Sequence, residues 1–195
     1  MSALVFPVGH YGGVRDDQTQ VIRVGWKQHR IDEKAFGVWV MAHGLPEVGK
    51  GQWTVQDVVE QSEKAGVEDA ASQVGALADL GLLAVVADNP IMATRFAQGH
   101  RMDVLFVGLG NAPDRLDGHA VGIPGLGTAA VLDPDCYELW QWGSVAPTVW
   151  HSCEVRATVT AKLGQEASPV DALAEILGDL RFLIAHGCAY LDVAG

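Results

Sequence analysis

Apolar and polar residues alternate along residues 19–24, a pattern typical of a half-buried β-strand. Gly25 indicates a turn or bulge, and residues 27–31 provide a return strand. Further upstream, residues 4–6 form a short apolar run that predicts an edge strand, and residues 12–17 form a loop rich in Gly and Asp. The chain is therefore predicted to begin with a strand, a loop and a hairpin.

The pattern then changes to helical spacing. Asp32 is placed to cap a helix that runs through apolar residues and ends at Gly44. Thr54 and Asp57 match a capping box, with Asp in place of the usual Glu, and a second helix follows that stops near Gly66. Two helices joined by a long loop are therefore predicted.

A third helix opens near Glu68, and its apolar residues have the spacing i, i+3, i+4. These residues are Val74, Leu77 and Ala78. Residues 83–86 continue as an apolar strand, and residues 88–90 carry a turn signal. Residues 91–96 are then predicted to return as the second strand of a wing.

The second half is rich in Gly and Pro and is predicted to contain short strands and a long terminal helix. The strands are residues 102–109, 120–123, 129–132 and 137–142. Ser168 and Pro169 supply a cap and a first helical position, and an apolar stripe leads from there to a stop at Gly187. We therefore predict an α+β protein in two domains. Residues 1–97 form a winged helix-turn-helix with its core in 18–96, and residues 98–195 form a smaller mixed domain of short antiparallel strands and two helices.

Composition narrows the class of protein. With 49% hydrophobic and 19% charged residues over 195 positions, the chain can bury a core and is not of the disordered type. No apolar run approaches the ~18 residues that span a bilayer, and the first residues lack a basic signal region. Three widely spaced cysteines are typical of reduced thiols. We expect a cytoplasmic location and no membrane partner.

The charge of the chain disfavours DNA, which is the usual partner of a winged helix. The net charge is −11, and residues 54–90 contain Lys64 as their only base against seven acidic residues. Affinity for DNA phosphates depends on clustered Lys and Arg, so DNA binding is disfavoured for the third helix. Protein or peptide binding and oligomerisation are the remaining uses of such a module.

Several motifs in this half resemble the PqqD-like recognition domain of peptide-modification pathways. These motifs are Ile31-Asp32, Val38-Trp39, Gly44, Thr54-Val55-Gln56-Asp57-Val58-Val59, and Leu77 followed by Leu80-Gly81-Leu82-Leu83. The resemblance implies a small winged helix that binds the leader segment of a precursor peptide, which adds as a strand to the hairpin edge and lies against the third helix. The chain departs from the family in the insertion of residues 45–52 and in the acidic third helix, which favours a basic peptide.

Binding of this kind uses an edge strand for affinity and side-chain pockets for specificity. The candidate residues are Trp26, Lys27, His29 and Ile31 along the strand, and Ala71, Gln73, Val74 and Leu77 along the helix. The alternative is that Trp26 and Val74 belong to the core.

Two His-x-Cys pairs are the candidate chemistry of the second half. They are His151 with Cys153 and His186 with Cys188. Imidazole and thiolate suit zinc, but residues i and i+2 share a face only on a strand, and the spacing is not that of common zinc sites. Separate buried groups are the simpler interpretation. No nucleotide-binding glycine motif is present, and no cofactor is expected.

Aromatic residues cluster in the second half. The cluster is Tyr137, Trp140, Trp142 and Trp150. Aromatic anchors are enriched at interfaces, so a homodimer or partner surface is one interpretation, and a shared core with the final helix is the other.

The leading function is non-catalytic recognition of a peptide or protein, in a peptide-modification or natural-product pathway. The alternatives are a transcription regulator with a C-terminal sensor or dimerisation domain, and, third, a thiol- or metal-dependent enzyme.

Overall fold

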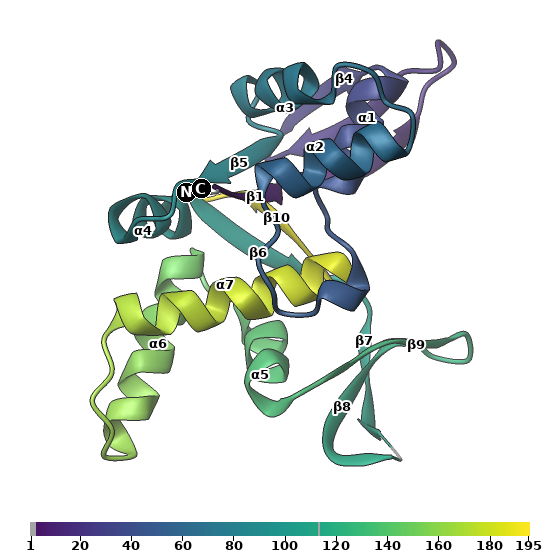
Figure 1. Ribbon diagram of the computed structural model, residues 1–195. Coiled ribbons are helices and arrows are strands. Elements are labelled where there is room, and N and C mark those ends of the chain that lie inside the picture. The colour runs from purple at the N-terminus through teal and green to yellow at the C-terminus, as the bar shows by residue number, and fades with distance from the viewer. Residues whose placement is uncertain (1–2, 113) are drawn as a thin grey trace.

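The computed structural model describes residues 3–112 and 114–195, which form two lobes with short strands between them (Figure 1). Its helices are α1 (Glu33–Met41), α2 (Val55–Lys64), α3 (Ala70–Asp79), α4 (Pro90–Gly99), α5 (Pro134–Gly143), α6 (Val149–Lys162) and α7 (Pro169–Ala185), with a 3-10 turn, η1 (Pro46–Val48). Its strands are β1 (Leu4–Pro7), β2 (His10–Val14), β3 (Gln20–Val24), β4 (Lys27–Ile31), β5 (Leu83–Val86), β6 (His100–Val104), β7 (Val107–Ala112), β8 (Arg115–Ile123), β9 (Gly127–Leu132) and β10 (Ala189–Val193). The mixed α and β composition agrees with the predicted class.

The upper lobe of Figure 1 holds the sheet β2-β3-β4 and helices α1 to α3. The predicted hairpin, three helices and following strand are confirmed. The side chain of Asp32 accepts a hydrogen bond from the N–H of Ala35, and Thr54 and Asp57 form the predicted capping box. Apolar side chains from the hairpin and from all three helices fill one core. Among its buried members are Ile22, Val38, Trp39, Val58 and Leu77.

The predicted wing is wrong, because residues 91–96 lie in helix α4 rather than in a strand. The side chain of Asn89 accepts a hydrogen bond from the N–H of Met92, and Pro90 occupies the first turn, so Asn-Pro starts a helix here. Strand β5 pairs instead with β1, antiparallel, from the beginning of the chain. The boundary predicted between residues 97 and 98 falls inside α4.

Three further predictions need correction in the second half. Residues 137–142 belong to helix α5, because Asp133 caps it and the buried side chains recur at helical spacing. These buried residues are Cys136, Leu139, Trp140 and Gly143. The single strand predicted over residues 102–109 is two strands, β6 and β7, and residues 98–195 contain α5, α6 and α7 rather than two helices. The strands predicted at 120–123 and 129–132 are confirmed within β8 and β9, and the capped terminal helix is confirmed as α7.

Strand β1 lies between the two cores. The predicted strand at residues 4–6 is confirmed as β1, which pairs with β5 in a two-stranded sheet. On its other side, the N–H of Val5 donates to the carbonyl of Trp53. Val5 is buried in the upper core, whereas Phe6 is buried in the lower core. The two faces of one strand therefore serve two different cores. Strand β2 lies where a loop was predicted.

The last strand, β10, completes the junction. It pairs antiparallel with β6, and its Leu191 carbonyl accepts a hydrogen bond from the N–H of Gly9 at 2.7 Å. Val8, just after β1, also forms a parallel bridge with Leu191, so segments from near the two ends of the sequence meet at this junction. Among the described residues, no helix is both long and apolar enough to cross a membrane.

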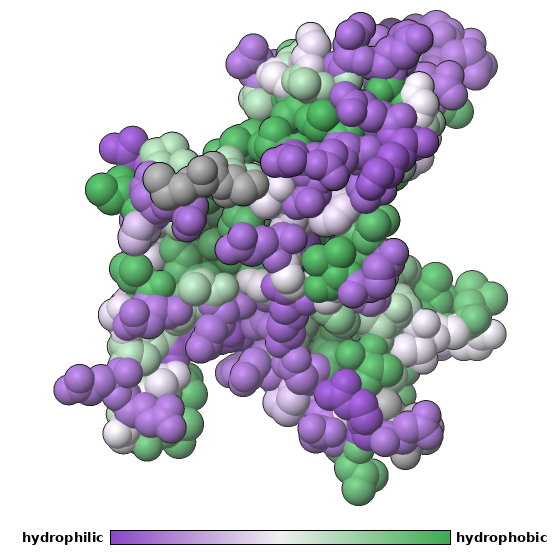
Figure 2. Space-filling view, in the orientation of Figure 1, coloured by the Kyte–Doolittle hydropathy of each residue, from purple (hydrophilic) through white to green (hydrophobic). Residues whose placement is uncertain are grey.

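Strands β7, β8 and β9 form an antiparallel arm that projects from the lower lobe (Figure 1). Figure 2 shows apolar residues at the tip of this arm and mainly hydrophilic residues on the visible face of the upper lobe. Leu126, between β8 and β9, is one of the exposed apolar side chains of the arm.

Candidate functional site

Strand β4 is an edge of the sheet β2-β3-β4, and it pairs with β3 along its whole length. The turn between them consists of Gly25 and Trp26, and Gly25 has the positive φ that a tight hairpin turn requires at this position. In such a hairpin the residues that flank the turn exchange hydrogen bonds, and pairing then alternates along the strand. The N–H and C=O groups of Gln28 and Arg30 therefore point outward, and no described residue supplies them with a backbone partner.

The opposite edge of the same sheet is less regular. Strand β2 pairs with β3 through a register shift between Tyr11 and Gly13, which leaves Gly12 as a bulge. Bulges bend a strand and reduce its ability to pair with another chain. Strand β4 has five residues with neither a bulge nor a proline. Of the two edges, β4 is the one suited to strand addition.

A buried carboxylate of the last strand fixes the β3–β4 turn. Asp192 of β10 is 5% exposed, and its Oδ1 accepts a hydrogen bond from the N–H of Gly25 at 2.6 Å. Arg23 holds the same turn, since its Nη1 donates to the Gly25 carbonyl at 2.8 Å and lies 3.4 Å from Asp192 Oδ2. The edge is thus preorganised by contacts that span most of the chain. Sequence reasoning missed Asp192, because no local pattern links it to Gly25.

The predicted strand residues divide between solvent and core. Trp26 is fully exposed at the turn and Lys27 is exposed beside it, whereas Ile31 is buried. His29 is half-buried, and burial, followed by the charge of Lys27, lowers the pKa of its imidazole. Trp26 is therefore not a core residue. Lys27 and exposed Arg30 bring positive charge to this edge, although Asp17 Oδ2 lies 3.9 Å from Arg30 Nη1 and compensates part of it.

The four predicted helix residues do not form the wall of a groove. Val74 and Leu77 are buried in the same core as Ile31, so their side chains do not line an open groove. Ala71 is exposed and Gln73 is half-buried. Three of the four predicted strand residues are thus at least partly accessible, whereas Ile31 and two of the four helix residues are buried in the core.

The insertion of residues 45–52 faces the lower lobe rather than the strand edge. Lys50 Nζ lies 2.6 Å from Asp133 Oδ2 and 2.7 Å from Asp179 Oδ1. Arg156 contacts the other oxygen of Asp179 at 2.9 Å. Asp179 is only 2% exposed, and these two cations compensate its buried charge. The insertion therefore fastens the upper lobe to α7.

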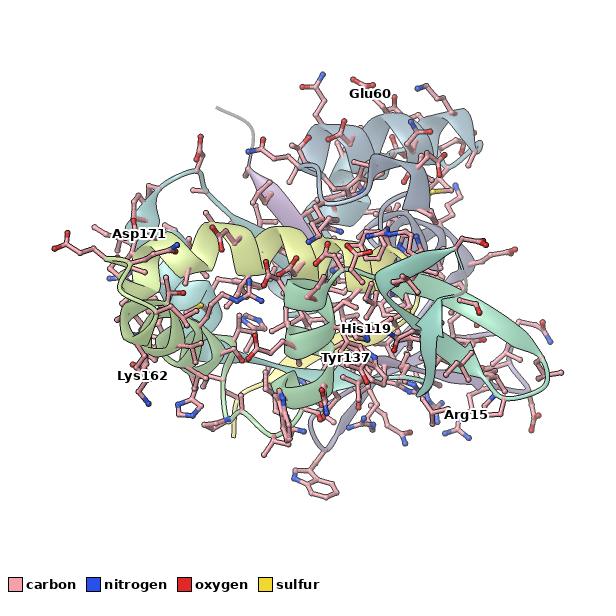
Figure 3. The ribbon with its side chains drawn as sticks, turned by 90° about the horizontal axis from the view of Figure 1, so that it is seen from below. Arg15, Glu60, His119, Tyr137, Lys162 and Asp171 are labelled. Carbon is pink, nitrogen blue, oxygen red and sulfur yellow. The ribbon has the colours of Figure 1, made fainter. Side chains whose placement is uncertain are left out.

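The four aromatic residues of the predicted interface do not form one surface. Trp140 is buried and donates its Nε1–H to the carbonyls of Leu105 and Cys188, so it belongs to the lower core. Tyr137 is half-buried and stacks on His119, with ring centroids 4.1 Å apart (Figure 3). Trp150 is half-buried and packs against the same core. Trp142 is exposed and lines a cavity of about 210 Å³ between α5 and α6.

The His-x-Cys pairs do not converge. On helix α6, His151 is exposed and Cys153 is buried, because residues i and i+2 of a helix point to different sides. His186 and Cys188 lie at the end of α7, where the imidazole Nδ1 is 2.9 Å from the Phe182 carbonyl. Within residues 3–112 and 114–195, no group of three or more metal-binding side chains forms a site.

Burial also suppresses thiolate chemistry. It raises the pKa of the Cys153 thiol to about 12 and that of Cys188 to about 11. The pKa of Cys136 is raised as well, first by burial and then by the negative charge of Asp179. All three thiols are therefore protonated at neutral pH.

Comparison with protein-family models, curated proteins and solved structures finds no match to this chain.

Proposed function

We propose that this protein recognises an extended peptide or protein segment, which adds as a fourth strand to the outer edge of β4. The observation that carries the proposal is the regular, unpaired edge of β4 beside a turn held by Asp192. A partner strand would find outward N–H and C=O groups at Gln28 and Arg30, and a rigid edge lowers the entropic cost of pairing. The order of a hairpin and three helices in the upper lobe supports the proposed resemblance to PqqD-like domains.

Charge indicates the kind of segment. Lys27 and Arg30 are exposed on the edge, and Arg15 lies close enough to donate to the Gln28 side chain at 3.3 Å. Helix α3 itself carries only Asp79 among its ten residues as a charged group. Strand β4 itself carries Lys27 and Arg30 and no acidic residue, so we propose that the bound segment is acidic instead of basic.

A proline at an outward position tests strand addition. We expect Gln28→Pro to weaken the binding of acidic extended peptides, selected from a random library on the wild-type protein, by at least about tenfold, because it removes an outward N–H without removing a bond to β3. Affinities are measured by fluorescence anisotropy, and circular dichroism verifies that the variant is folded. Gln28→Ala is the matched control and keeps wild-type affinity.

Hydrogen exchange locates the bound segment independently. Binding should slow exchange of the Gln28 and Arg30 amides while leaving β2 unaffected. If the selected peptides bind Gln28→Pro as tightly as the wild type and do not protect these amides, the site is not the β4 edge.

A further inference from the structure

A cavity of about 280 Å³ lies between the lobes, along one face of α7. The lining residues of α7 recur every three or four positions from Val170 to Arg181. Because a helix rises about 1.5 Å per residue, this α7 stripe, the part of α7 that lines the cavity, is ~16 Å long. The other walls come from Leu4 and Phe6 of β1, residues 50–53, Val86 of β5, and residues 87–90 and 93 around the start of α4. Most of the surface of the cavity is apolar, as in small-molecule sites.

The stripe ends at a buried cation. Arg181 is 3% exposed and lies over the Phe6 ring, with the guanidinium carbon 4.4 Å from the ring centroid. Its Nη1 donates to the carbonyls of Ala42 and His43 at 3.0 and 3.3 Å, and its Nη2 donates to the carbonyl of Val5. A guanidinium has five N–H donors. The Nε–H and one Nη2–H of Arg181 therefore have no acceptor among the described residues.

Arg181 also has no carboxylate partner among the residues that the structure describes. The other cation of the cavity, Lys50, already pairs with Asp133 and Asp179. Burial lowers the pKa of Arg181 to about 10, so the side chain is still charged at neutral pH. Buried charges in proteins are normally paired, and carbonyl dipoles alone compensate only part of the cost.

We propose that this cavity binds a medium-chain carboxylic acid, whose alkyl chain lies along the α7 stripe and whose carboxylate accepts hydrogen bonds from Arg181. The planar guanidinium suits a carboxylate, and the apolar residues Leu173 and Leu177 suit the chain. Asp88, the acidic residue of the lining, is exposed at the surface. The site is separate from β4 and does not depend on peptide binding there.

Decanoate and decanol are the probes that test this site on the full chain. We expect isothermal titration to show saturable binding of decanoate at one site, and decanol, which has the same chain but no charge, to bind at least about tenfold more weakly. Decanoate should also raise the melting temperature as it saturates the site. Equal affinity for the two probes, or no saturable binding of decanoate, would overturn the proposal.

The second test uses substitutions on the cavity wall, because replacing Arg181 would also remove its contacts between the two lobes. Ala174→Trp fills the cavity from α7 and should abolish decanoate binding, whereas Ala161→Trp on the exposed face of α6 should leave it unchanged. Folding of both variants is verified by circular dichroism. Wild-type decanoate affinity in Ala174→Trp would place the fatty acid elsewhere and contradict the proposal.

Discussion

Arg181 and Asp192 are buried charged side chains that bond to main-chain groups from the other end of the chain. The carbonyls of Ala42 and His43 lie at the C-terminal end of α1, where a helix leaves its last carbonyls without internal partners. Arg181 supplies those partners and adds positive charge at the negative end of the helix dipole. Single residues thus connect elements that no local sequence pattern associates.

His43 gives the molecule a pH-dependent stability. Burial lowers the pKa of its imidazole to about 4, against the 6.5 expected in the unfolded chain, although hydrogen bonds to the Trp39 and Val40 carbonyls favour the protonated form. The native state therefore binds fewer protons than the unfolded state between pH 6.5 and 4, and stability must fall as the pH decreases through this window. We expect a loss on the order of 2 kcal/mol, measured by urea unfolding at a series of pH values.

The variant His43→Gln isolates this contribution. It should lose less stability than the wild type between pH 6.5 and 4.5, because its side chain does not titrate. Parallel stability curves for the two proteins would mean that His43 is not the titrating group.

At the scale of elements, capped helices were predictable and long-range pairings were not. Asp32, Thr54 and Ser168 each cap the helix that their sequence predicted. Asn89 and Asp133 act in the same way, but each precedes a proline. The sequence predicts a turn at residues 88–90 and no helix that starts at Asp133. The apolar spacing of residues 136–143 is helical and could have identified α5.

The pairing of strands is harder to predict from the sequence than the capping of helices. Residues 83–86 were correctly predicted as a strand, yet their partner is β1 rather than residues 91–96. The next strand along the chain is the partner that a sequence predicts by default, because the two can form a hairpin. Pairing with β1 instead reflects the position of β1 between the two cores, with one face buried in each. The edge of β4 was predictable from its hairpin, and the core position of Val74 was one of two alternatives, but the clamp by Asp192 was not predictable.

A cap substitution tests the helical state of residues 90–99. Asn89→Ala removes the hydrogen bond that Asn89 Oδ1 accepts from the Met92 N–H at 2.9 Å, and should reduce the free energy of unfolding by about 1 kcal/mol. Urea unfolding measures the change. Asp88→Ala, at the neighbouring exposed position, is the control and should change stability by less than about 0.5 kcal/mol. Equal effects of the two substitutions would argue against the cap.

For the whole molecule, the net charge of −11 opposes attraction to nucleic acid. We expect binding to non-specific duplex DNA to be negligible at low salt, with a flat dependence of log affinity on log salt, because few phosphates would be neutralised. Fluorescence anisotropy with a labelled duplex at 20 to 200 mM salt measures this. Tight binding at low salt with a steep negative slope would instead favour the transcription-regulator alternative.

The position of β10 has a consequence for how the chain is made. The ribosome releases the β3–β4 hairpin well before Asp192, whose carboxylate holds the turn of that hairpin. Strand β6 likewise cannot pair until β10 has been synthesised, and β1 cannot pair until β5 has been synthesised. Such distant pairings give a high contact order, which slows folding. The buried core of the upper lobe comes from residues 5–83 alone, so what must wait for β10 is the fixing of the β3–β4 turn rather than the packing of that core.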